Sequence, residues 1–163
     1  MNIIDILLKE TEQEAQTTRK FLKLIPEDKY DWRPHPKSMN LQQLTTHIAE
    51  LPAWVTLALT TDGLDFATAP YEPSTINNNA DLLKSFEDAY ADGRAHLQAT
   101  NEEELAKPWI LRNGEQILAD MNKYETVRVA INQTIHHRAQ LGVFLRLLDI
   151  PIPGSYGPSA DEQ

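Results

Sequence analysis

The sequence predicts an all-α fold: a four-helix bundle with a long crossover loop and a minor hairpin-like insertion. Four stretches carry apolar side chains at helical spacing, and two of them begin with the Asn-x-x-Gln/Glu pattern of a capping box. A long segment rich in proline, threonine and asparagine separates the second stretch from the third, which favours a crossover over a simple up-and-down order. The length fits one domain, so we expect residues 1–163 to form a single bundle domain.

The first predicted helix spans residues 2–24. Its apolar side chains recur at helical spacing between charged ones, and Pro26 ends the run. In the segment that follows, up to residue 39, two prolines disfavour helical geometry in the residues before them. We expect an ordered connection that is held in place by Trp32.

A second helix is predicted to start at Asn40. Gln43 stands three residues later, as a capping box requires, and His47 lies on or beside the buried stripe that follows. Pro52 lacks the amide that would bond to the Ile48 carbonyl, so we expect a kink just beyond His47. Such a kink would widen the bundle around the imidazole.

The crossover loop is predicted over residues 63–78, and Asn79 or a neighbour is expected to cap the third helix, which Gly93 weakens slightly. Further along, Asn113 and Gly114 stand between two short apolar runs, a strong local signal for a tight turn. We expect a minor hairpin or an extended loop there.

The last predicted helix begins at Asn122, which forms a second capping-box pattern with Glu125, and it continues to about Leu148. Residues 151–163 are rich in proline and glycine, so they cannot extend the helix. We expect this tail to pack over one end of the bundle before it frays.

The composition excludes several classes of protein. With 24 acidic and 15 basic side chains the formal charge is −9, which repels phosphate backbones, so we expect no nucleic-acid partner. There is no cysteine, so any metal site must use nitrogen and oxygen ligands. The amino terminus lacks a signal-peptide pattern and no apolar run approaches the roughly 18 residues of a membrane span, so we expect a cytoplasmic protein with no membrane partner.

Three side chains stand out as candidate metal ligands: His47, Gln133 and His137. Ligands on one helix must lie three or four residues apart to reach one ion, which makes Gln133 the partner of His137. The adjacent His136 differs from His137 in direction by roughly 100°, so we expect it to have a structural role. An amide oxygen is a poorer ligand than imidazole for zinc or nickel, so we expect a weaker site than one with three histidines.

Other interpretations stay open at this point. From spacing alone, histidines on separate amphipathic helices are more often hydrogen-bonded polar groups near a core than metal ligands. A carboxylate ligand from Glu10 or Glu14 is an alternative, although a salt-bridged surface is the more ordinary interpretation of that pair. His35 is expected in a loop and His96 at the surface. The sequence contains no nucleophile elbow, phosphate-binding glycine loop or His-Glu-x-x-His motif, so an enzymatic function depends on the metal.

Four segments of the sequence, in this order and spacing, carry a family resemblance that extends over nearly the whole chain. They read DWRPHPKSM at 31–39, LTTHIAELPAW at 44–54, HHRAQLGVFLR at 136–146 and IPGSYGPSADE at 152–162. Together they resemble the DinB/YfiT-like superfamily of metalloenzymes. The resemblance implies a four-helix bundle, commonly dimeric, and we therefore expect a homodimer.

The resemblance also implies a divalent metal, held by one histidine of the second helix and a His-x-x-x-His pair of the last. These positions fall on His47, Gln133 and His137, so the sequence departs from the family pattern at Gln133. Some relatives are thiol S-transferases that use bacillithiol, mycothiol or glutathione. We expect a metal-dependent thiol S-transferase or hydrolase that acts on a small molecule through zinc, nickel or manganese, with a low-molecular-weight thiol as co-substrate. The alternative is a non-catalytic, stress-related binding or dimerisation module with a degenerate metal site.

Overall fold

The chain is mostly helical, with one small sheet. The computed structural model describes residues 2–162. Its helices and strands are α1 (Ile3–Leu22), α2 (Leu41–Glu50), α3 (Ala53–Thr60), β1 (Gly63–Asp65), α4 (Asn79–Ala99), α5 (Glu102–Leu105), β2 (Pro108–Asn113), β3 (Gln116–Asn122) and α6 (Lys123–Leu147). Short 3₁₀ turns occupy Glu27–Lys29 and Ala160–Glu162.

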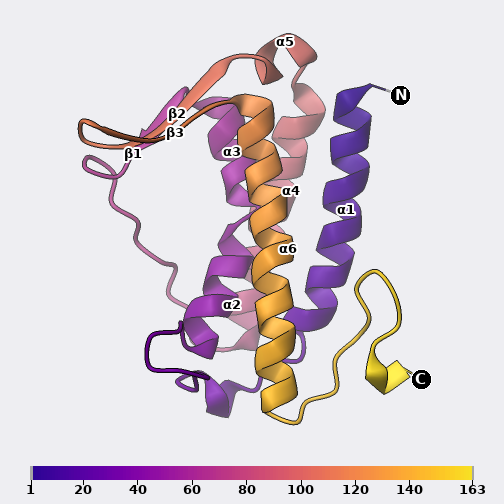
Figure 1. The fold of residues 1–163 in the computed structure, drawn as a ribbon. Coiled ribbons are helices and arrows are strands. Elements are labelled where there is room, and N and C mark those ends of the chain that lie inside the picture. The colour runs from indigo at the N-terminus through magenta and orange to yellow at the C-terminus, as the bar shows by residue number, and fades with distance from the viewer. Residues whose placement is uncertain (1, 163) are drawn as a thin grey trace.

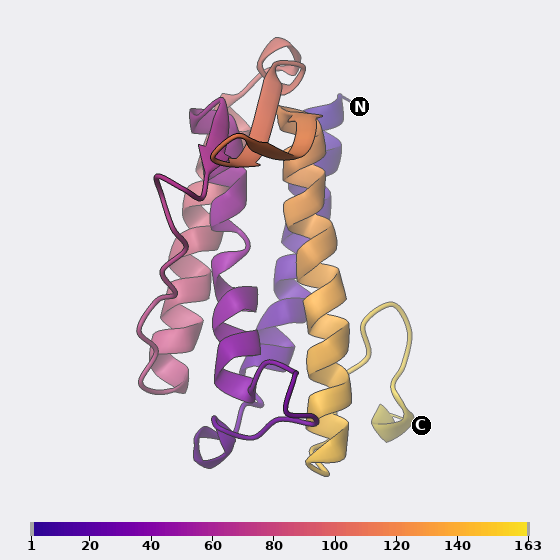
Figure 2. The same ribbon diagram turned by 60° about the vertical axis from the view of Figure 1, so that its left-hand side comes forward.

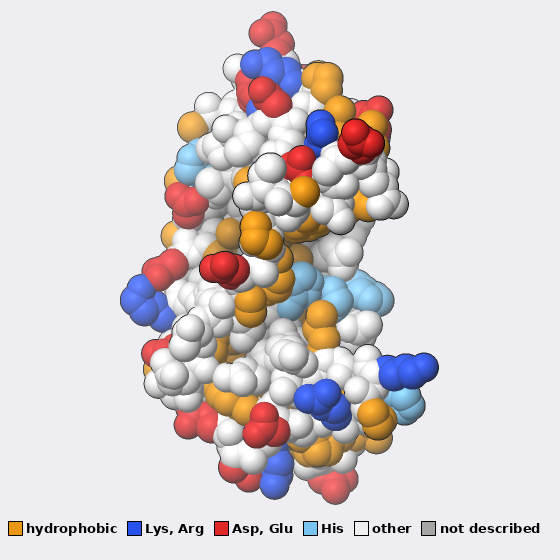
Figure 3. All heavy atoms as spheres, turned by 90° about the vertical axis from the view of Figure 1, so that its left-hand side faces the viewer, with side chains coloured by type: hydrophobic (Ala, Val, Ile, Leu, Met, Phe, Trp, Pro, Cys, Tyr) orange, Lys and Arg blue, Asp and Glu red, His pale blue; other side chains and the backbone are white. Residues whose placement is uncertain are grey.

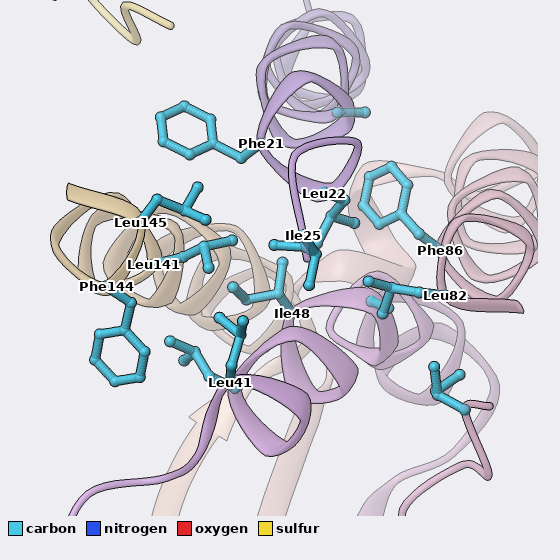
Figure 4. Packing of buried hydrophobic residues seen from close by; sticks show 14 of the residues in the cluster. Phe21, Leu22, Ile25, Leu41, Ile48, Leu82, Phe86, Leu141, Phe144 and Leu145 are labelled. Atoms are coloured by element: carbon cyan, nitrogen blue, oxygen red, sulfur yellow. The ribbon is translucent and has the colours of Figure 1, made fainter. Parts of the chain in front are cut away.

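The long helices form a bundle in which α1 lies diagonally opposite the α2–α3 pair and α4 lies diagonally opposite α6. Helix α1 packs against α4 and α6, and the α2–α3 pair packs against the same two helices. Figure 4 views the helices nearly end-on, with α1 opposite α2 and α4 opposite α6. The chain runs down α1, up α2 and α3, up α4 and down α6 (Figures 1 and 2). The predicted crossover is confirmed, because the loop before α4 must return along the bundle for α3 and α4 to run parallel.

Asparagine side chains begin five of the helices. In each case the side-chain oxygen accepts a hydrogen bond from the amide three residues later, at 2.8 Å, which satisfies one free amide of the first turn; the caps are Asn2, Asn40, Asn78, Asn101 and Asn122. The capping boxes at Asn40 and Asn122 are confirmed, with both reciprocal bonds present. The cap of the third long helix is Asn78, which is the neighbour of Asn79 and so agrees with the prediction of Asn79 or a neighbour.

Pro52 does more than kink the second helix, because it separates α2 from α3. Proline cannot donate to the Ile48 carbonyl, and helix α3 begins directly after it. Helix α4 passes close to this break at Gly93, where an added Cβ would lie 2.8 Å from the Pro52 carbonyl oxygen and 3.2 Å from the Val55 Cβ. The structure therefore explains Gly93 as a close-approach residue, which helix propensity alone does not reveal.

The hairpin insertion is confirmed, and it is part of a three-stranded sheet. Strands β2 and β3 pair antiparallel around the Asn113–Gly114 turn, where Gly114 has a positive φ of 60°. Strand β1, within the predicted crossover loop, pairs parallel with β2. The fold is thus a helical bundle with a small sheet at one end, where the prediction was all-α with a hairpin (Figure 1).

The core consists of two apolar clusters along the bundle axis. One joins the end of α1, α2, the first half of α4 and the end of α6, and Figure 4 displays it. The other joins the start of α1, α3, the end of α4 and the start of α6. On α6, His137 lies between Ile131 of the second cluster and Leu141 of the first.

The carboxyl-terminal tail is attached to the bundle by polar contacts. Tyr156 Oη bonds to the Glu14 carboxylate at 2.9 Å and to Arg138 at 3.1 Å, while Asp161 accepts from Arg146 at 3.0 Å. The tail therefore packs against the sides of α1 and α6, whereas the prediction placed it over one end of the bundle. Across residues 2–162, no helix combines the length and the apolar character needed to cross a membrane.

Candidate metal centre

The structure brings His47 and His137 together. His47 lies in the last turn of α2 and His137 in the middle of α6, two helices that pack against each other. Their ring centroids are 4.6 Å apart and the rings are nearly perpendicular, at 85°. The two imidazoles are therefore in edge-to-face contact between α2 and α6. In Figure 3, histidine side chains form a row near the middle of the face shown.

Both imidazoles are held in the neutral form that a metal requires. Burial lowers the pKa of His47, and the nearby His137 lowers it further. Burial also lowers the pKa of His137, against a hydrogen bond that His137 donates to Gln140 and that raises it. Because both values lie below the ordinary 6.5, each ring keeps a free nitrogen lone pair at neutral pH.

Gln140 fixes the tautomer of His137. The His137 Nδ1 lies 2.9 Å from the Gln140 side-chain oxygen, and because an amide oxygen can only accept, Nδ1 carries the proton. The lone pair of His137 is thus on Nε2. The Gln140 amide nitrogen in turn donates to His136 Nε2 at 3.1 Å. His136 is exposed and completes this surface network, which agrees with the structural role predicted for it.

The sequence analysis missed Gln140. The signal that identifies it is its spacing, since it lies three residues after His137 and four after His136, within reach of both on one helix. A polar side chain in that register can orient an imidazole whose other nitrogen binds a ligand.

Gln133 lies one turn before His137 on α6, and its side chain is exposed. Within residues 2–162, no group of three or more His, Asp or Glu side chains converges to hold an ion. The two histidines are therefore the only strong donors of the centre in the described chain. A third protein ligand would have to be the amide oxygen of Gln133.

The alternative carboxylate ligands are engaged elsewhere. Glu10 pairs with Arg128, and Glu14 pairs with the buried Arg138 at 2.6 Å. Both glutamates form salt bridges, as that interpretation expected, but Glu14 is buried and not part of a salt-bridged surface. His35 lies in an exposed loop, as predicted, and His96 is a partly exposed residue of α4 that contacts Asp92.

A groove of about 810 Å³ begins at His47. Its floor is the outer face of α2, with Gln43 and Thr46 beside His47. The loop 33–39 forms one wall and the crossover segment 71–77 forms the other. Its volume is in the range of about 300–1,000 Å³ typical of small-molecule sites.

Both walls of the groove are fastened to the bundle. Glu50 accepts hydrogen bonds from the Tyr71 hydroxyl at 2.5 Å and the Ser74 amide at 2.6 Å, which ties the crossover to α2. Gln42 donates to the Ile76 carbonyl at 2.7 Å. On the other wall, the Trp32 ring packs edge-on against Phe144 of α6 with centroids 5.5 Å apart, which confirms its predicted role.

The fold and this centre define a class of protein: a helical bundle with a histidine pair between two helices, of which one histidine lines a surface groove. The sequence matches the DinB family over residues 1–163, and the chain belongs to that family. The predicted family resemblance is therefore confirmed. No curated protein sequence matches the chain.

Solved structures share the fold at low sequence identity. A DinB-like protein from Bacillus subtilis has a TM-score of 0.70 at 17% identity, over 91% of this chain and 96% of its own. YfiT from Bacillus subtilis, described as a probable metal-dependent hydrolase with an unusual four-helix bundle topology, has a TM-score of 0.68 at 13% identity, over 91% and 89%. A mycothiol-dependent maleylpyruvate isomerase has a TM-score of 0.58 at 13% identity, over 86% of this chain and 61% of its own.

Proposed function

We propose that this protein is a metal-dependent enzyme, a hydrolase or thiol S-transferase, whose divalent ion is bound by His47 and His137 with Gln133 as a weak third ligand. The observation that carries the proposal is the pair of neutral imidazoles 4.6 Å apart, one of which, His47, lines a groove large enough for a small molecule. The solved relatives named as metal-dependent and mycothiol-dependent support the same chemistry.

The residues of the centre fit a metal in their donor chemistry. Neither ring nitrogen of His47 has a hydrogen-bond partner among residues 2–162, and Nε2 of His137 is left free by the bond from Nδ1 to Gln140. A bound divalent ion supplies Lewis acidity, which lowers the pKa of a coordinated water or thiol near neutrality. Because His47 would hold the ion and also lines the groove, a molecule bound in the groove would lie beside the ion.

The protein's own residues have separate tasks in this proposal. His47 and His137 bind the ion, and Gln140 keeps His137 in the correct tautomer. Gln133 offers either an amide oxygen to the ion or an amide donor to a bound water. The groove along α2 binds the substrate beside His47 and replaces part of its hydration shell.

A second candidate function is a non-catalytic binding or dimerisation module that has lost its metal. The observation that favours it is Gln133, a neutral side chain at a position where the histidine pair needs a third strong donor.

Metal binding separates the two functions. We expect purified protein, titrated with zinc, nickel and manganese, to bind one equivalent and to melt at a higher temperature with the metal. His47→Ala and His137→Ala should each abolish this shift, while the control His96→Ala on α4 should not. Absence of binding by all three metals would contradict the enzyme proposal.

Gln133→His tests the geometry directly. If the three positions surround one point, a third imidazole should raise metal affinity by about two orders of magnitude or more. An unchanged affinity would mean that residue 133 does not face the histidine pair, and the proposed ligand set would be wrong.

A further inference from the structure

The groove below His47 has a charge opposite to that of the whole molecule. The chain carries a net charge of −9, yet no aspartate or glutamate lines the groove. The charged side chains that do line it are Arg33 and Lys37, both on the wall formed by residues 33–39. Basic side chains also appear below the row of histidines in Figure 3.

Arg33 differs from the other arginines in having no carboxylate partner. Each of the other six is within 4.0 Å of an aspartate or glutamate oxygen: Arg19, Arg94, Arg112, Arg128, Arg138 and Arg146. Among residues 2–162, no ion pair includes Arg33 or Lys37. In a chain with an excess of carboxylates, two neighbouring cations without partners remain available to an external anion.

The loop that carries these cations is ordered. The Trp32 carbonyl accepts from the Leu41 amide at 2.8 Å, and the Tyr30 carbonyl accepts from the Gln42 amide at 3.0 Å, so the loop is joined to the start of α2. Within the loop, the Lys37 amide donates to His35 Nδ1 at 3.1 Å. Because the backbone under both cations is fixed, less entropy is lost when they bind a ligand.

We propose that Arg33 and Lys37 bind the anionic group of the substrate, a small molecule that carries a carboxylate or a phosphate. The proposal rests on the proposed function, because it assigns the groove beside His47 to that substrate. A guanidinium can bind either anion through two parallel hydrogen bonds, and the lysine adds a second positive charge. The remaining length of the groove would direct the reactive end of the molecule toward the histidine pair.

The test uses succinate and inorganic phosphate as probes, with succinamide as the uncharged analogue of succinate. Each is titrated into the metal-free, full-length protein and followed by backbone amide NMR. We expect at least one of the two anions to shift the amides of residues 33–39, 42–47 and 71–77, and succinamide to leave them unchanged. The stronger of the two anions then identifies the substrate as a carboxylate or a phosphate ester.

The variant for this test is Arg33→Gln combined with Lys37→Gln, and the matched control is Lys9→Gln with Lys20→Gln, which removes two exposed charges from α1. We expect the groove variant to bind the anion about tenfold more weakly, and the control to retain the wild-type affinity. Equal anion binding by the groove variant and the wild type, or shifts that lie outside the groove, would overturn the inference.

Metal titration of the same variants distinguishes this inference from the proposed function. Loss of anion binding with unchanged metal binding supports both. Loss of anion binding in a protein that binds no metal supports the anion site and overturns the metal-dependent function. If the wild-type protein binds metal but binds neither anion, the anion site alone is overturned.

Discussion

At the scale of single residues, Gln140 and Arg138 show how helix α6 combines a functional surface with a buried anchor. Gln140 faces outward and links the two adjacent imidazoles, His136 and His137. Arg138 faces inward and is only 2% exposed, where it binds Glu14 and Thr18 of α1. Substitutions at these neighbouring positions should therefore separate metal affinity from stability.

Gln140→Leu should reduce metal affinity without unfolding the protein. Loss of the amide oxygen frees the His137 ring to rotate and to change tautomer, and groups that orient a ligand in this way contribute about 10–100-fold in affinity. Competition with a chelator of known affinity measures the change. Gln13→Leu, an exposed glutamine on α1, is the matched control. Equal affinities for the two variants would rule out an orienting role for Gln140.

Arg138→Met should destabilise the fold by about 3–5 kcal/mol, because it leaves the Glu14 carboxylate buried without its charged partner, with only the Tyr156 hydroxyl bonded to it. Urea unfolding measures the difference. Arg94→Met, which removes a 4.0 Å surface pair with Glu12, should cost less than about 1 kcal/mol. Adding Glu14→Leu to Arg138→Met should recover much of the loss, and a double variant no more stable than the single one would show that the ion pair is not the cause.

At the scale of elements, the crossing of α4 over the break between α2 and α3 and the attachment of the tail to the bundle each depend on a few specific contacts. The break is where α4 makes its closest approach, at Gly93. The tail depends on the Arg146–Asp161 pair and on a hydrogen bond from the Ile152 amide to Asp161 at 2.9 Å. Changes at Gly93 and at Asp161 should therefore have measurable effects on stability.

Gly93→Ala should destabilise the protein by about 1–3 kcal/mol, although alanine is the better helix former, since the new methyl group would meet the Pro52 carbonyl oxygen at 2.8 Å. The matched control is Gly142→Ala on α6, where the added Cβ would make an ordinary 3.4 Å contact with the Phe21 ring. Thermal unfolding of both variants provides the comparison. A stabilised Gly93→Ala protein would mean that the helices separate easily at this crossing.

The tail contact should depend on pH in a defined direction. The hydrogen bonds from Arg146 and from the Ile152 amide lower the pKa of Asp161 from 3.8 to about 2. Because the folded-state pKa is the lower one, this carboxylate stabilises the folded chain above pH 3.8, and the contribution is lost as the pH falls toward 2.

Asp161→Asn tests this direction. Its deficit in unfolding free energy relative to the wild type should be present at about pH 6 and should shrink as the pH approaches about 2. Asp31→Asn, at an exposed position without an ion pair in residues 2–162, is the control and should match the wild type at both values. A deficit that is independent of pH would contradict the assignment.

At the scale of the whole molecule, the sequence predicts what is local and misses what depends on distant partners. The long helices and both capping boxes follow from periodicity and from Asn40 and Asn122, which act within one turn. Strand β1 was missed because its three residues pair with β2, more than forty residues later in the chain. The four-residue helix α5 is too short for a periodic signal.

For the candidate site, too, the sequence predicts some of the residues and not others. His47 and His137 were paired by the family resemblance, and the structure places them in contact. The sequence does not predict the roles of Arg33 and Lys37, because these depend on the absence of carboxylate partners. It does not predict the role of Gln140 either, because this depends on a network of side-chain hydrogen bonds. Neither property can be read from spacing alone.

The position of α1, diagonally opposite the α2–α3 pair, has a consequence for how the chain reaches this structure. In a simple antiparallel bundle, each helix can zip onto the one made just before it, so short-range contacts form early. Here α1 has its helical neighbours in α4 and α6, which begin 57 and 101 residues after the end of α1 at Leu22. Contacts so distant in sequence raise the entropic cost of the transition state, so refolding should be slow for a helical protein, and a nascent chain that ends at α3 still lacks the two helices, α4 and α6, that pack most extensively against α1.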